Sequence, residues 1–532
     1  MKFRNRLAVG AVALTAALGL ALSAADAKTF KYAFQGDLNA LDPYTLNETF
    51  TLAAIGNVME GLTKRDKDLK IIPGLAEKWE NPEPTRWRFY LRKGVKYQGG
   101  EDFTADDVVF SADRARHADS QIKSRMQAGT KVVKIDDHTV DFITEKPNPI
   151  IYYEWDTWYI FSKKWAEANG AQAPQSAKST SLNPWALKAN GTGPFSIESH
   201  TPGVKTVFKK NAGWWNKAEH NLDEVTFQTI KSDATRVAAL LSGEIDMMEP
   251  VPPQDIERIN ASAKTQVLVG PEIRTIFLNM DSFRDELKYS SVKGKNPFKD
   301  ARVRKAFYQA IDIEAIKSKV MRNMSVPSAL LISPLMFPKG NEIKRHPYDV
   351  EAAKKLMEEA GYKDGFELRV DCPNDRYVND EAICQAVVAM FSRINVKATL
   401  NAIPKAKYFE MAGPTSKYDS SFGMLGWTPG SGDSHNVIDQ IMGCRDADGK
   451  GGTFNYGGWC NPKITALADR IIVETDTAKR DAMILEAYKI VHEEVGLIPL
   501  HQQSLAWGVA KSIKMVQRAD NQILFHWIQK SE

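Results

Sequence analysis

The chain of 532 residues has few cysteines and almost no excess of charge of either sign. Four cysteines are too few to hold together a scaffold built from disulfides. The 70 basic and 66 acidic residues give a formal net charge of +4, which argues against a surface that binds nucleic acid. These shortages exclude small disulfide-rich domains and nucleic-acid-binding proteins, and they leave a large globular protein.

Recognisable frames for catalysis and metal binding are also missing. The segment HEEVG, which begins at His492, lacks the second histidine of a zinc protease, and the nucleophile motif GxSxG does not occur. The segment DADGKGG at 446–452 is too short for an EF-hand loop, and none of the nine histidines lies at ligand spacing from another. Together with the export signal and the family resemblance described below, these absences lead us to expect a protein that is not an enzyme and that holds no metal and no cofactor.

The first 27 residues have the pattern of an export signal. The basic start MKFRNR precedes an almost wholly apolar stretch, Leu7 to Leu22, and Ala25-Asp26-Ala27 has the small-x-small form that a signal peptidase cleaves. An apolar core of about 16 residues is shorter than the roughly 20 that a spanning helix needs. We therefore expect cleavage after Ala27. Because no cysteine lies at the cleavage site, we expect no lipid anchor.

The rest of the chain mixes strand and helix patterns and is too long for a single core. Trp87 to Lys96 alternates apolar and basic residues as a half-buried strand does, and Thr104 with Asp107 forms a capping box at the start of a helix. Further patterns predict a strand at 274–282 and helices at 52–59, 296–316, 349–361, 380–394 and 480–494.

Three stretches resemble extracellular solute-binding protein family 5, the periplasmic dipeptide-, oligopeptide- and nickel-binding proteins of ABC importers. They are residues 61–115 with FTADDVV, GTGPFSIESHTPGVKTVFKKNAGWW at 191–215, and LLSGEIDMM at 240–248. The resemblance covers most of residues 30–505. It implies an α/β fold like that of type II periplasmic binding proteins, with two lobes that have central mixed sheets and are joined by a hinge, plus an extra N-terminal subdomain.

The same resemblance implies a division of the chain. We expect a signal peptide at 1–27, lobe I from 28–74 with 186–285 and 500–532, the extra subdomain at 75–185, and lobe II at 286–499.

The function implied is that of the solute-binding component of an ABC importer. The protein would capture a small solute, a di- or oligopeptide above all, and deliver it to a permease in the inner membrane. It would be a soluble, monomeric periplasmic protein that binds no nucleic acid. Two alternatives stay open: a binding protein for a non-peptide solute such as nickel, and a periplasmic hydrolase or peptidase that uses Asp433 and His435.

Two polar loops are the expected ligand contacts. By position, the loop CPNDRYVND at 372–380 resembles the one from which dipeptide-binding relatives direct an arginine to the ligand carboxylate, and Arg376 occupies that place. An alternative is a surface arginine paired with a neighbouring aspartate. The loop GWTPGSGDSHNV at 426–437 resembles the one that packs a tryptophan, here Trp427, on the ligand.

The acid that receives the ligand amine in these relatives is absent. Gly430 occupies its place, so either Asp433 or Glu48 takes over the amine, or the ligand has none there. In the family the segment after the first strand lies at the lip of the cleft, which makes Asn47, Glu48 and Thr49 candidates for contact. The start of an ordinary helix explains these three residues equally well.

Two further clusters have alternative interpretations. Six aromatic residues within 151–161 either pack a core or line a binding wall, and packing is the commoner role. Cys444 and Cys460 flank a glycine-rich polar loop that resembles a cysteine-bounded loop of dipeptide-binding relatives, which implies a disulfide. The alternative is four buried thiols, and the state of Cys372 and Cys384 stays open.

Overall fold

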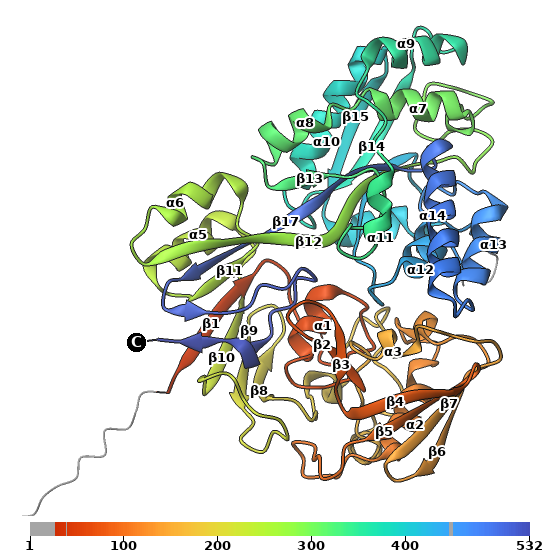
Figure 1. Ribbon diagram of the computed structural model, residues 1–532. Coiled ribbons are helices and arrows are strands. Elements are labelled where there is room, and N and C mark those ends of the chain that lie inside the picture. Colours follow the sequence, from red (N-terminus) through yellow and green to blue (C-terminus); the bar gives the residue numbers. More distant parts are fainter. Residues whose placement is uncertain (1–26, 39, 446–450, 532) are drawn as a thin grey trace, which may run out of the picture.

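The computed structural model of the protein describes residues 27–38, 40–445 and 451–531 (Figure 1). The predicted signal peptide lies outside these residues up to Asp26, and the first strand, β1 (Thr29–Phe34), begins just after the predicted cleavage site. Within the described residues, no helix is both long and apolar enough to cross a membrane.

One mixed sheet of 11 strands extends through both lobes, in the order β15-β14-β16-β12-β17-β11-β1-β10-β9-β8, with β13 paired to β17. Strand β1 pairs in parallel with β10 and β11, and β14 pairs in parallel with β15 and β16, while the other pairs are antiparallel. The remaining strands of this sheet are β8 (Phe195–Thr201), β9 (Lys205–Lys210), β10 (Glu224–Thr229), β11 (Met247–Glu249), β12 (Thr265–Met280), β13 (Ser325–Pro327), β14 (Glu367–Pro373), β15 (Lys397–Ile403), β16 (Phe422–Trp427) and β17 (Ile498–Ala510).

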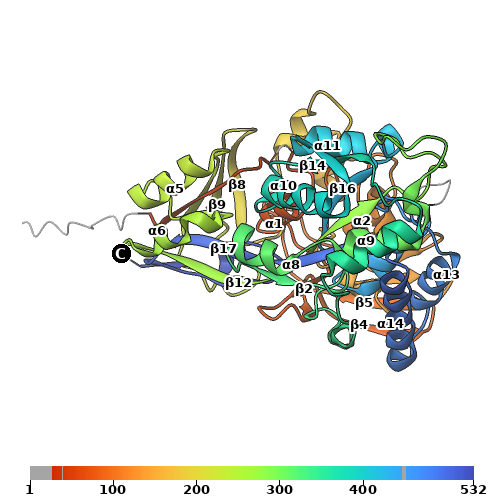
Figure 2. The same ribbon diagram turned by 90° about the horizontal axis from the view of Figure 1, so that it is seen from above.

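The two longest strands of the sheet, β12 and β17, join the lobes. They lie side by side in two perpendicular views and pair from Thr265 with Ala510 at one end to Leu278 with Ile498 at the other (Figure 1 and Figure 2). Their register shifts between Pro271 and Thr275, midway between the lobes. The predicted strand at 274–282 is therefore only the second half of β12. The sequence pattern missed the first half because Gly270 and Pro271 interrupt it.

Lobe I, at the lower left of Figure 1, contains β1 and β8 to β11, and lobe II, at the top, contains β13 to β16. Helices cover the sheet in both lobes, and each lobe encloses two apolar clusters. The helices of lobe I are α1 (Thr49–Ile55), α5 (Asp233–Ser242) and α6 (Ile256–Asn260). Those of lobe II are α7 (Ala301–Gln309), α8 (Ile313–Ala315), α9 (Val350–Glu359), α10 (Asp380–Phe391), α11 (Lys405–Ala412), α12 (Ser434–Val437), α13 (Pro462–Ile471) and α14 (Thr477–Glu493).

Three of the predicted helices appear within a few residues as α9, α10 and α14, but the prediction at 296–316 was wrong in its continuity. The segment contains a 3₁₀ turn at Pro297–Lys299 followed by α7 and α8. Asp300 accepts a hydrogen bond from the backbone N–H of Arg302 (2.9 Å), and Asp312 accepts one from Ala315 (2.9 Å). Each aspartate therefore caps the start of a new helix, and the segment does not form one continuous helix.

A separate small sheet forms the lower right of the molecule in Figure 1, with the strand order β4-β5-β7-β6. Its elements are β4 (Ala76–Glu83), β5 (Arg86–Leu91), α2 (Ala105–Ala115), β6 (Lys131–Asp136), β7 (Thr139–Ile143), α3 (Ile151–Glu154) and α4 (Lys163–Asn169). The predicted strand at 87–96 is β5, and the capping box of Thr104 and Asp107 is present at the start of α2. The hairpin β2 (Thr63–Arg65) and β3 (Ile71–Pro73) lies beside this sheet.

The aromatic residues of 151–161 mostly pack the core of this small subdomain. Trp155 and Trp158 are fully buried and stack with ring centroids 4.0 Å apart. The packing interpretation therefore holds for these rings. Three polar residues of the same stretch, Glu154, Asp156 and Thr157, instead line a cavity that is described in the next subsection.

Candidate functional site

A cavity of about 690 Å³ lies where lobe I, lobe II and the small subdomain meet. This volume is in the range of sites for small molecules, and such sites favour interfaces between domains. Lobe I contributes the segment before α1, the subdomain contributes the end of α3 and the turn at Arg125, and lobe II contributes the two loops after β14 and β16. Of the predicted site residues, Asn47, Glu48, Thr49, Arg376, Trp427 and Gly430 line this cavity.

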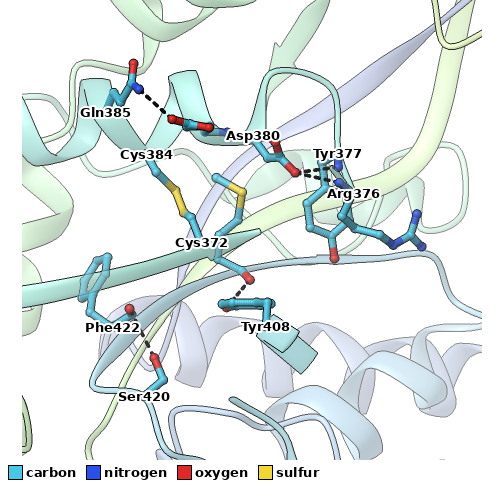
Figure 3. Close-up of a disulfide and its surroundings, with 11 residues drawn as sticks. Cys372, Arg376, Tyr377, Asp380, Cys384, Gln385, Tyr408, Ser420 and Phe422 are labelled. Atoms are coloured by element: carbon cyan, nitrogen blue, oxygen red, sulfur yellow. Dashed lines mark hydrogen bonds between the residues drawn. A yellow bond between two sulfur atoms is a disulfide. The ribbon is translucent and has the colours of Figure 1, made fainter. Parts of the chain in front are cut away.

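The loop that carries Arg376 is held in place at both ends. It leaves β14 at Pro373 and enters α10 at Asp380, and a disulfide joins Cys372 to Cys384 across it (Figure 3). The Asp380 carboxylate accepts hydrogen bonds from the backbone N–H groups of Arg376 (2.9 Å) and Tyr377 (3.0 Å). The loop geometry is therefore fixed before any ligand arrives.

The side chain of Arg376 is directed away from the disulfide (Figure 3) and lines the cavity. Neither neighbouring aspartate pairs with its guanidinium, because Asp380 binds backbone amides and Asp375 accepts a hydrogen bond from the backbone N–H of Lys405. Its nearest acid is Glu48, with 4.0 Å between Nη2 and Oε1. The Arg376 side chain is only 18% exposed, so a ligand carboxylate would meet it largely out of water.

Glu48 both caps α1 and lines the cavity. As the N-cap of α1, its carboxylate accepts hydrogen bonds from the backbone N–H and the hydroxyl of Thr51, both at 2.9 Å. Burial acts to raise the pKa of Glu48, but Arg376 and the bonds from Thr51 outweigh burial and lower this pKa. Glu48 therefore stays charged opposite Arg376.

Trp427 stands at the end of β16 with its ring at the cavity. Its indole N–H donates to Asn436 Oδ1 (2.8 Å), and its ring centroid lies 4.7 Å from that of Phe454. The ring is therefore held in one orientation and offers an apolar surface to a ligand.

Asp433 does not line the cavity, so the geometry does not support it as the acceptor of a ligand amine. Its two carboxylate oxygens accept hydrogen bonds from Arg480 of α14 (2.9 and 2.7 Å), and one of them also caps α12 through the backbone N–H of His435 (2.8 Å). Burial acts to raise the pKa of Asp433, but Arg480 lowers it overall. Because Arg480 comes 47 residues later in the chain, only the tertiary fold creates this pair.

The same contacts bear on the proposed hydrolase. A catalytic pair needs a carboxylate that orients the imidazole ring of its histidine. One carboxylate oxygen of Asp433 accepts a hydrogen bond from the backbone N–H of His435, and both oxygens accept hydrogen bonds from the Arg480 guanidinium. The pair is therefore arranged as a helix cap.

Sequence analysis missed Arg125, which lies on the subdomain side of the cavity. Its guanidinium donates to Thr157 Oγ1 (2.7 Å) and Asn47 Oδ1 (2.6 Å), both neutral acceptors. A Cβ atom at Gly430 would lie 3.4 Å from Arg125 Nη2. At the position where the resemblance leads one to expect an acid, this protein therefore places a glycine opposite an arginine.

Two more charged residues at the cavity were also missed. Arg65 of β2 pairs with Asp156 and donates to the backbone carbonyl of Ser431 in lobe II (2.7 Å). Glu154, at the end of α3, is the other. The only signal in the sequence was that polar residues interrupt an aromatic cluster, and this does not reveal which face they occupy.

Both cysteine pairs are within disulfide range. Cys444 pairs with Cys460, the pairing that the resemblance implied, and Cys372 pairs with Cys384, which sequence analysis had left open. Among the residues that the structure describes, no three of His, Cys, Asp and Glu gather in a group that could hold a metal ion.

Comparisons with known proteins agree with this architecture. A model of bacterial extracellular solute-binding proteins, family 5 Middle, matches residues 70–449. The dipeptide-binding protein of Escherichia coli (strain K12) is 26% identical, with 96% of this chain and 95% of that protein covered. The glutathione-binding protein GsiB of Salmonella choleraesuis (strain SC-B67) is 25% identical, with 94% of each covered.

Two solved structures share the fold. The periplasmic binding protein DppA from Helicobacter pylori in complex with the peptide STSA has a TM-score of 0.80 at 21% identity, covering 95% of this chain and 98% of that chain. The dipeptide-binding protein of Pseudoalteromonas sp. SM9913 in complex with Met-Leu also has a TM-score of 0.80, at 20% identity, covering 95% of this chain and all of that chain.

Proposed function

The chain belongs to the bacterial extracellular solute-binding proteins of family 5, and we propose that it captures a short peptide that bears an anionic group in the cavity between its lobes. The observation that carries this proposal is the position of Arg376. Its guanidinium faces the cavity on a loop fixed by a disulfide and by Asp380, and its nearest acid, Glu48, lies 4.0 Å away. An arginine that faces a cavity in this way can bind a carboxylate through two parallel hydrogen bonds.

Three other groups complete the proposed site. Arg125 offers a second guanidinium that has only neutral partners among its hydrogen bonds. Trp427 supplies an apolar surface, and Glu48 with the adjoining Asn47 and Thr49 forms the lobe I side. The relatives named for dipeptides and glutathione support a short peptide as the ligand class.

In this proposal the protein works as the solute-binding component of an ABC importer. It is exported, begins at Lys28 after cleavage, acts as a monomer in the periplasm, and delivers the solute unaltered to a permease in the inner membrane. The division into lobe I (28–74, 186–285 and 500–532), the extra subdomain (75–185) and lobe II (286–499) belongs to the same proposal.

Mass spectrometry of the solute that copurifies with the protein tests this function. We expect a short peptide, released unaltered and in stoichiometric amount when the protein is unfolded. Calorimetric titration of the ligand-free protein with the identified solute should then restore one molecule per chain. Turnover of peptides by the purified protein would support a hydrolase instead, and a bound solute that is not a peptide would contradict the proposed ligand class.

A further inference from the structure

Glu154 is a carboxylate at the cavity that the proposed function does not yet use. It is the last residue of α3 and lines the cavity between the buried Trp155 and the half-buried Tyr153. Asp433, in the lobe II loop after β16, also acts on the charge of Glu154.

Three other acids that line the cavity each have a cation or a hydrogen-bond donor of their own. Asp156 pairs with Arg65, and Asp520 pairs with Arg518. Glu48 accepts two hydrogen bonds from Thr51. Among the contacts of the described residues, Glu154 forms no hydrogen bond and no ion pair.

An ionised carboxylate without partners is unfavourable in a desolvated place. The charged groups that face Glu154 are Arg125 and Arg65, which favour its charge, and Asp156 and Asp433, which oppose it. Burial exceeds all of them, and the pKa of Glu154 rises to about 7. Glu154 is therefore an acid whose charged form a cation would stabilise.

We propose that Glu154 receives the ammonium group of the ligand, while Arg376 of lobe II holds the anionic group. This inference rests on the proposed function and makes it narrower: the ligand is a peptide with a free amine, bound as a zwitterion across the cavity. The acid that is missing at Gly430 in lobe II is then supplied from the small subdomain.

The test uses a mixed pool of synthetic dipeptides, offered once with free amines and once as desamino counterparts, which lack the ammonium group without being larger. Binding to the full-length mature protein is measured by mass spectrometry of the retained fraction. We expect the ligand-free wild type to retain the free-amine pool at least about tenfold more strongly, and Glu154→Gln to lose that preference. Glu154→Asp should keep part of it, and Glu167→Gln, the same substitution on exposed α4, should behave as wild type.

The pH profile gives an independent readout. Retention of the free-amine pool by the wild type should fall as the pH drops below about 7, because the protonated form of Glu154 carries no charge to pair with the ammonium group. Retention by Glu154→Gln should lack this fall.

Equal retention of both pools by the wild type, or wild-type retention of the free-amine pool by Glu154→Gln, would overturn the role of Glu154 while leaving peptide binding intact. A wild type that retains neither pool would exclude a dipeptide ligand and with it the role of Glu154, whereas the identity of the copurified solute decides the proposed function separately.

Discussion

At the scale of single residues, the charges at the cavity decide what the protein can bind. Arg376 lies 4.0 Å from its nearest acid, and Arg125 donates hydrogen bonds only to neutral acceptors, whereas Asp433 and Asp156 form closer pairs with Arg480 and Arg65. A group that is already paired inside the protein gains little from a ligand, whereas an unpaired one gains a charge-assisted hydrogen bond.

Replacing Arg376 tests the anion site most directly. We expect Arg376→Ala to weaken binding of the copurified peptide by roughly 2 to 5 kcal/mol, because the ligand carboxylate is left desolvated without a partner. Arg376→Lys should retain only part of the wild-type binding free energy, since an ammonium group cannot form two parallel hydrogen bonds with a carboxylate. Titration calorimetry measures both, and the control is Arg393→Ala, because Arg393 lies in the 3₁₀ turn after α10 and donates a hydrogen bond to the Tyr348 hydroxyl. Wild-type affinity in Arg376→Ala would place the anion site elsewhere.

A carboxylate introduced at position 430 tests Arg125. A side chain can be accommodated there, since its Cβ would lie 3.4 Å from Arg125 Nη2, and the new carboxylate of Gly430→Asp should pair with that guanidinium. We expect affinity for the copurified peptide to fall roughly tenfold or more, because the new acid competes with the ligand anion. Gly430→Asn, which is similar in size but uncharged, separates this effect from crowding. An equal loss in both variants would contradict it.

These residues also show where sequence reasoning ended. Arg376 and Trp427 were predicted because their loops resemble ligand loops of dipeptide-binding relatives, and both residues line the cavity. Glu154 and Arg125 were missed because they come from a different part of the chain and reach the cavity only through the tertiary fold. Asp433 was assigned to the ligand because its partner, Arg480, lies on a distant helix.

At the scale of elements, local signals were reliable and interrupted ones were not. The capping box of Thr104 and Asp107 gave the start of α2 because its hydrogen bonds are local. Strand β12 was found only from residue 274, since Gly270 and Pro271 hide the half that pairs with β17 in lobe I. The mixed sheet itself came from the family resemblance, because pairing across 200 residues leaves no local pattern.

The disulfides belong to this scale because each one fixes a segment of lobe II near the cavity. The disulfide Cys444–Cys460 closes a loop with a sequence separation of 16. In the chain-entropy model such a crosslink raises the free energy of unfolding by about 3 kcal/mol. We expect Cys444→Ser with Cys460→Ser to lower the free energy of unfolding by roughly that amount in urea. Labelling of the unfolded, unreduced wild type should find no free thiol, and four labelled thiols would contradict both pairings.

At the scale of the whole molecule, the two lobes touch across the cavity as well as through β12 and β17. Arg65 donates to the Ser431 carbonyl of lobe II (2.7 Å), and Gln35 of lobe I donates to the Asp375 carbonyl (3.3 Å). Both contacts join the lobes at the two ligand loops. A ligand shifts the protein toward this closed arrangement of the lobes only if it binds the closed arrangement more tightly than a more open one.

Loss of the Arg65 hydrogen bond to Ser431 should shift the equilibrium between the closed and the open arrangement of the lobes. Arg65→Ala removes a charged donor to the Ser431 carbonyl, a bond worth roughly 1.5 to 3 kcal/mol, so the open arrangement should gain population and the peptide should bind about ten- to a hundredfold more weakly. Small-angle X-ray scattering should show a larger radius of gyration for the variant at subsaturating ligand and recovery of the compact form at saturation.

The control for this shift is Arg88→Ala, which also breaks an ion pair, that of Arg88 Nε with Asp141 Oδ1 (2.7 Å), but within the small sheet and away from the lobe contact. It should scatter and bind as wild type does. Arg65→Ala also releases Asp156, so a loss of affinity alone could arise locally. Only a change of molecular dimensions that saturating ligand reverses assigns the loss to opening of the lobes, and a variant that binds weakly with wild-type dimensions throughout would contradict the role of Arg65 in holding them together.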